Sequence, residues 1–135
     1  LLAAAVALSC GAPPWDTYRG GPGRAGSLRP TLAVQPTAVR WRTDLGAPSF
    51  SSPVRADGYL TVGSNDDFVN FLSTETGAVV WRYKTNGDVA AGAALAGGRA
   101  YIGSSDGHLY ALDLRKRRLL WRYAAPGRLL TDVVI

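Results

Sequence analysis

The chain has no methionine, one cysteine (Cys10) and one histidine (His108). A single cysteine excludes an intrachain disulfide, even in an oxidising compartment. Without a cluster of cysteine and histidine, the sequence offers no zinc site. The one glutamate, Glu75, falls in an expected turn, and His108 opens an alternating stretch that favours a rim histidine over a general base. We therefore expect no catalytic residue and no metal ligand.

The missing methionine also bears on the start of the chain. A primary translation product begins with methionine, and a secretory signal begins with a basic stretch before its apolar core. This chain begins directly with the apolar run Leu1–Leu8. We therefore expect residues 1–9 to be the remnant of a signal peptide, and the 135 residues to be a fragment of a longer protein.

Three tryptophans, Trp41, Trp81 and Trp121, lie forty residues apart, and each is followed by arginine. Residues 56–83 align with residues 96–123 at this shift without a gap. A period of about 40 residues filled with short strand-like runs is typical of a β-propeller, one four-stranded blade to each repeat. The sequence predicts an all-β fold, a partial propeller of four-stranded antiparallel blades. Residues 38–135 supply about two and a half blades at that period.

Turn residues divide each repeat into strands. Asp66, Asp67 and Asp106 lie in the expected hairpin turns, where aspartate is favoured for backbone reasons. Calcium chelation by these carboxylates is the alternative. Small residues at 89–96 suit an innermost strand, and a new inner strand is expected at 131–135. The predicted strands are Tyr59–Gly63, Phe68–Leu72, Ala78–Lys84, Val89–Ala96, Arg99–Gly103, His108–Leu112, Arg118–Ala124 and Thr131–Ile135.

The tryptophans are expected to be structural. A large ring with one N–H donor buries much apolar area where two sheets meet, so each indole suits a wedge between neighbouring blades. A ligand-stacking surface is the alternative.

The repeats resemble those of the pyrroloquinoline-quinone-type (PQQ-like) propellers, whose docking motif reads Ala-x-Asp-x-x-Thr-Gly-x-x-x-Trp. The first copy keeps Thr76, Gly77 and Trp81, and the second keeps Ala111, Asp113 and Trp121. The resemblance implies a structural docking role for these residues and for Trp41. Since many members of this class bind no quinone, it implies no cofactor.

The segment Ala7-Leu8-Ser9-Cys10 resembles a bacterial lipobox, although the usual leucine three places before the cysteine is absent. The resemblance implies lipidation at Cys10 and an outer-membrane lipoprotein facing the periplasm. An ordinary signal peptide with a chance cysteine is the alternative. Residues 10–37 hold five prolines and five glycines, which indicates a tether or loosely docked arm.

The net charge is +5 and the sequence pI is near 9.8. Such values are typical of nucleic-acid binders, but an exported protein seldom meets nucleic acid, so we expect none. The densest basic run, Arg115–Arg118, falls in an expected turn and is interpreted as a solvated turn. Contact with anionic lipid head groups or an acidic partner is the alternative.

These observations favour a non-enzymatic lipoprotein of the bacterial envelope that binds other envelope proteins, in the manner of the outer-membrane barrel-assembly (BamB-like) lipoproteins. Two alternatives stay open. One is a fragment of a periplasmic PQQ-dependent quinoprotein dehydrogenase, and the other is a sensor or ligand-binding propeller attached to a further domain. A propeller fold is compatible with all three.

Overall fold

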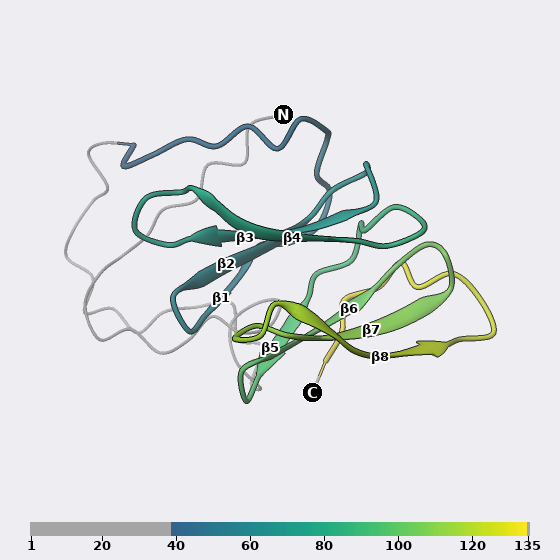
Figure 1. Ribbon diagram of the computed structural model, residues 1–135. Helices are drawn as coiled ribbons and strands as arrows, with labels where there is room; N and C mark the ends of the chain where they lie inside the picture. Colours follow the sequence, from purple (N-terminus) through teal and green to yellow (C-terminus); the bar gives the residue numbers. More distant parts are fainter. Residues whose placement is uncertain (1–38, 135) are drawn as a thin grey trace, which may run out of the picture.

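The structure, a computed structural model, describes residues 39–134 (Figure 1). This part of the chain forms eight strands in two four-stranded antiparallel sheets. It contains no helix long and apolar enough to cross a membrane. The predictions for residues 1–37, Cys10 among them, lie outside the described residues.

Each sheet has the order of the sequence, every strand pairing with the next. We call the sheets blade 1 and blade 2. Blade 1 consists of β1 (Val54–Ala56), β2 (Tyr59–Gly63), β3 (Phe68–Ser73) and β4 (Val79–Lys84). Blade 2 consists of β5 (Ala94–Ala96), β6 (Arg99–Gly103), β7 (His108–Asp113) and β8 (Arg118–Ala124). The prediction of four-stranded antiparallel blades is confirmed.

Most predicted strand bounds are met within one residue, but the innermost strand was predicted too long. Only Ala94–Ala96 of the range 89–96 pairs as a strand. Residues 89–93 form a buried crossover, because the Val89 N–H bonds to the Ser64 carbonyl instead of a ladder partner. The inner strand expected from Thr131 is likewise absent at residues 131–134. The repeat of Ala94 falls only at Val134.

The two blades bury opposite faces against each other. On β3, Val69 and Phe71 point into the shared core, whereas on β7 the inward residues are Tyr110 and Leu112. These strands are equivalent at the forty-residue shift, but their inward positions differ by one residue. Since side chains alternate across a strand, an offset of one reverses the face. The stacking of one sheet's front on the next sheet's back is what a propeller requires.

The core between the blades is mainly apolar. The short inner strands β1 and β5 lie beside each other, and the two sheets fan out from them. Burying apolar area of this kind supplies the main stabilisation, at about 25 cal/mol per Å². The buried members are Val54, Val69, Phe71, Val89, Ala93, Leu95, Ala100, Ile102, Tyr110, Leu112 and Leu114.

Two glycines allow the crossovers to pass directly over the sheets. A Cβ on Gly63 would overlap the carbonyl oxygen and side chain of Val89, and a Cβ on Gly103 would lie 2.9 Å from the Leu129 Cβ. At the same places the N–H groups of Val89 and Leu129 donate to the carbonyls of Ser64 and Ser104, at 3.2 Å in both cases. Glycine is therefore required by close backbone approach rather than by a turn.

The substitution Gly63→Ala is predicted to destabilise the fold by about 2–3 kcal/mol, because a methyl group cannot enter a contact made by backbone. Chemical denaturation measures the loss. The matched control is Gly127→Ala, where an added Cβ meets nothing within 4 Å. That control should change stability by less than about 0.5 kcal/mol. Equal losses in the two variants would show that the contact at Gly63 is not what requires glycine.

Candidate functional site

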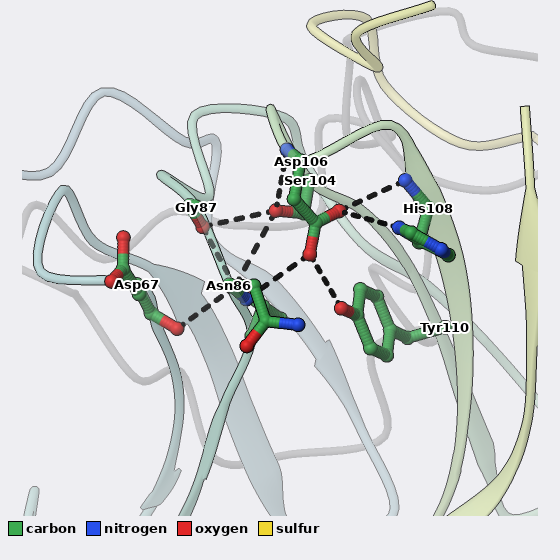
Figure 2. A network of polar contacts seen from close by, with 8 residues as sticks. Asp67, Asn86, Gly87, Ser104, Asp106, His108 and Tyr110 are labelled. Atoms are coloured by element: carbon green, nitrogen blue, oxygen red, sulfur yellow. Dashed lines mark hydrogen bonds and ion pairs between the residues drawn. The ribbon is translucent and has the colours of Figure 1, made fainter. Parts of the chain in front are cut away.

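The densest polar site in the described residues surrounds Asp106, in the turn between β6 and β7 (Figure 2). Its Oδ2 accepts hydrogen bonds from Tyr110 Oη at 2.5 Å and from the Asn86 backbone N–H at 3.0 Å. Its Oδ1 accepts from the His108 N–H at 2.9 Å and lies 3.3 Å from His108 Nδ1. Because Asn86 follows β4 of blade 1, this carboxylate joins the two blades.

The loop between the blades is also bonded from its other side. Ser104 Oγ donates to the Gly87 carbonyl at 2.9 Å, and Thr85 Oγ1 donates to the Asp67 carbonyl at 2.9 Å. Both hydroxyls are buried, Ser104 at 0% exposure and Thr85 at 1%. Figure 2 shows these contacts beside Asp106, so the loop is fixed by one turn from each blade. Removing such a buried partner costs more than the net gain of one hydrogen bond.

The environment of the site shifts two pKa values in opposite directions. Burial by itself raises the pKa of Asp106, but hydrogen bonds from Tyr110, from the N–H groups of Asn86 and His108, and from Ser104 outweigh it. The pKa of Asp106 therefore lies below its ordinary value. Burial, followed by the hydrogen bond and charge of Asp106, raises the pKa of Tyr110 to about 12. The pair is thus held as a carboxylate and a neutral phenol.

The Tyr110 shift predicts a loss of stability in alkali. A phenol whose folded pKa is raised stabilises the fold fully below its unfolded pKa, near 10. That stabilisation is lost as pH rises toward the folded value of about 12. Denaturation curves measured at several pH values should show this decline, and Tyr110→Phe should flatten it. At neutral pH the same variant should lose about 1.5–3 kcal/mol with its hydrogen bond to a charged acceptor.

Tyr123→Phe is the matched control for that experiment, since Tyr123 is 64% exposed. It should keep the alkaline decline of the parent chain. A decline that persists unchanged in Tyr110→Phe would contradict the assignment to the Tyr110–Asp106 pair.

Trp41 lies across the β3–β4 turn of blade 1. Its Nε1 donates to the Thr74 carbonyl at 3.3 Å, and its ring fills the space where a Cβ on Gly77 would be. Thr43 Oγ1 donates to the Gly77 carbonyl at 2.5 Å. Gly77 has a φ of +74°, which only glycine adopts without strain. Trp41 and Gly77, both predicted as docking residues, are therefore in direct contact.

Trp81 does not repeat this arrangement on the β7–β8 turn. Its ring stacks instead on Phe71 of its own blade, with centroids 4.6 Å apart and an interplanar angle of 14°. The residue equivalent to Gly77 is Arg117, which has a φ of +52° and carries the Cβ that Gly77 lacks. The phenyl ring of Phe71 stands where the motif, and Ala111 in the second copy, has alanine. The two departures from the motif together account for the different position of Trp81.

Arg117 in the left-handed region predicts a stabilising substitution. Arg117→Gly should raise the free energy of unfolding by about 0.5–1 kcal/mol, because glycine removes strain that exceeds its entropic cost. Thermal or chemical denaturation measures the change. Arg115→Gly, in the same turn but without a positive φ, is the control and should be neutral or destabilising. A destabilised Arg117→Gly variant would show that the Arg117 side chain makes a stabilising contact.

The remaining predicted docking residues have local roles in the structure. Thr76 Oγ1 accepts from the Ala78 N–H at 3.2 Å, and Asp113 Oδ1 accepts from the Lys116 N–H at 2.8 Å, so both cap turns. Ala111 is fully buried opposite Trp121 in the β7–β8 ladder. Trp121 is 46% exposed. No blade of the described chain lies beyond it, so its surroundings differ from those of Trp41.

Sequence reasoning missed the pairing of Asp106 with Tyr110. The sequence pattern places Asp106 in a turn and Tyr110 within an alternating strand, and it does not connect the two. The sequence does contain one signal, since Asn70, the equivalent of Tyr110 in blade 1, is also polar. In the structure Asn70 is buried and donates to Ser64 Oγ at 2.9 Å. His108, expected at the rim, is 29% exposed. Among residues 39–134 no group of three or more acidic, histidine or cysteine side chains is placed to hold a metal.

Comparison with known proteins places this architecture in a family. A family model described as "Outer membrane protein assembly factor BamB" matches residues 31–134, which is most of the chain. The chain belongs to the BamB family. Its blades are PQQ-like repeats of the kind that the docking motif predicted. The comparison with curated proteins found no match.

Solved structures support the assignment at the level of fold. The BamB of Moraxella catarrhalis is 28% identical, with a TM-score of 0.58, over 64% of this chain and 27% of that one. The chain therefore spans about a quarter of that BamB. A quinohemoprotein alcohol dehydrogenase of Pseudomonas putida HK5, ADHIIG, has 23% identity and a TM-score of 0.56 over 64% of this chain and 14% of its own. A computationally designed protein has 18% identity and a TM-score of 0.55, over 62% and 26%. The last two show the propeller fold alone.

Proposed function

We propose that this chain is part of a non-enzymatic lipoprotein of the bacterial envelope, a scaffold that binds proteins assembling the outer membrane. The family match over residues 31–134 supports the assembly role. The observation that supports the scaffold role is that the buried polar groups form hydrogen bonds that hold the two blades together. Asp106 and Ser104 of blade 2 are bonded to Asn86 and Gly87 after β4 of blade 1. Tyr110 and Thr85 support this contact from their own blades, so the site holds the scaffold in shape.

The docking residues are proposed to be structural for the same reason. Trp41 contacts Gly77 on the β3–β4 turn, and Trp81 packs on the shared core. The proposed set is Trp41, Trp81, Trp121, Thr76, Gly77, Ala111 and Asp113.

The proposed contact surface is the edge of the blades that carries the crossovers. Phe50 is 70% exposed and Leu130 is 56% exposed, and they occupy equivalent positions two repeats apart. The smaller Ala90 stands at the position between them. Large apolar side chains exposed at equivalent loop positions are typical of protein contact sites, because the fold itself gains nothing from them.

Membrane attachment is proposed to pass through Cys10. Lipidation there would leave residues 10–37 as a Pro/Gly-rich tether between the bilayer and the first blade, with the propeller facing the periplasm. A tether of this composition reaches far while adding little folded structure. No nucleic-acid partner and no cofactor are proposed.

The quinoprotein alternative has no specific observation in its favour. The chain is 23% identical to the dehydrogenase. Identity at this level supports a shared fold but not a shared activity. The observations on the described residues concern packing and loop exposure, and these favour the scaffold.

Site-specific photo-crosslinking in intact envelopes tests the proposal. A photoreactive residue at position 50 or 130 should capture a component of the outer-membrane assembly machinery, identified by mass spectrometry. The substitutions Phe50→Ser and Leu130→Ser should each lower recovery of that component about tenfold, a typical loss for one apolar contact residue.

Val79→Ser is the matched control, because Val79 is an exposed apolar residue (43%) at the opposite edge of blade 1. It should leave recovery unchanged. Capture of no assembly component from either position, or equal loss in Val79→Ser, would contradict the proposed surface.

A further inference from the structure

The two blades carry opposite charge at the edge away from the crossovers. In blade 2, this edge has five exposed cations, which lie on the β7–β8 turn or open the strands β6 and β8: Arg99, Arg115, Lys116, Arg117 and Arg118. The equivalent residues of blade 1 are Tyr59, Glu75, Thr76, Gly77 and Ala78, with a single charge, which is negative. Because both blades have the same fold, the backbone does not require these cations. We call the five residues of blade 2 the basic edge.

One member of the basic edge is retained against the preference of its backbone. Arg117 has a φ of +52°, whereas its counterpart Gly77 has a φ of +74°. A non-glycine residue in this region is strained by about 1–2 kcal/mol. Strain that the fold does not need points to a function for the side chain.

The basic edge is not neutralised by the described part of the chain. Within residues 39–134 none of the five cations forms an ion pair with a carboxylate. The nearest carboxylate in sequence, Asp113, is occupied in capping the turn through the Lys116 N–H at 2.8 Å. Leu120, the residue left unpaired by the bulge in the β7–β8 ladder, is 37% exposed just beyond the turn. Leu120 thus presents an exposed apolar side chain two residues after the four consecutive cations.

We propose that the basic edge is a contact site for the phosphate-bearing surface of an anionic membrane. Attraction of cations to such a surface depends on their number and proximity rather than on a fixed geometry. Recognition of a protein carboxylate by arginine is frequently bidentate and gains specificity and energy from that fixed geometry. Long side chains at a hairpin turn, without partners to position them, suit the membrane surface. Leu120 suits the boundary between head groups and acyl chains.

The proposal goes beyond the scaffold role and does not depend on it. It adds a second attachment to the one proposed at Cys10, and a single lipid chain combined with a polybasic patch binds membranes more firmly than either alone.

Vesicle co-sedimentation with the full, unlipidated chain tests the proposal. The chain should bind vesicles of phosphatidylcholine mixed with phosphatidylglycerol, should bind pure phosphatidylcholine weakly, and should be released by salt. Replacing residues 115–118 together by glutamine should weaken binding well over tenfold, at about fivefold per charge removed. Arg117→Gly alone, which relieves strain, should weaken it about fivefold. Inorganic phosphate at equal phosphorus concentration should not displace the chain.

The matched control removes the same number of charges elsewhere. It replaces four exposed cations outside the basic edge by glutamine: Arg82, Lys84, Arg122 and Arg128. On a logarithmic scale, the control should lower the affinity for anionic vesicles by less than half as much as the substitution of residues 115–118. An equal loss in the control would overturn the proposal, as would equal binding to neutral vesicles or displacement by inorganic phosphate. Tighter binding to polyglutamate than to anionic vesicles would also overturn it, in favour of a site for an acidic protein.

Discussion

The structure depends on one packing constraint, the contact of the front of one sheet with the back of the next. Val69 and Phe71 of blade 1 meet Tyr110 and Leu112 of blade 2 because equivalent strands use opposite faces. The contact is close enough that the connecting segment must cross the sheet at Gly63, against bare backbone. Apolar burial supplies the free energy and does not by itself fix the angle or register of the sheets.

The polar contacts supply that register. Asp106 accepts from Asn86 of the neighbouring blade and from Tyr110 of its own, so a displacement of either blade breaks charge-assisted hydrogen bonds. The two tryptophans are placed differently at the rim. Trp41 lies on a glycine turn, whereas Trp81 stacks on Phe71.

Much of the fold could be read from the sequence because the repeat supplies two aligned copies of each strand and turn. Tyr59–Gly63 and Arg99–Gly103 have the predicted bounds. Residues 89–93 were misassigned because small buried residues suit an inner strand and a crossover alike, and only the partner of the Val89 N–H distinguishes them. The Asp106 site needed contacts between blades, which a local pattern does not contain. The stacking of Trp81 on Phe71 could not be predicted for the same reason, because it depends on whether the β7–β8 turn of the other blade can accept the ring.

The offset of one residue between equivalent strands has an evolutionary consequence. Each sheet has two different packing faces, and the front of one sheet fits the back of the next, so any copy of the repeat can follow any other. Tandem duplication of a whole unit would therefore lengthen such a protein without inventing a new interface. Duplicates would then be free to differ at their rims, as Glu75 and Arg115 do at equivalent positions.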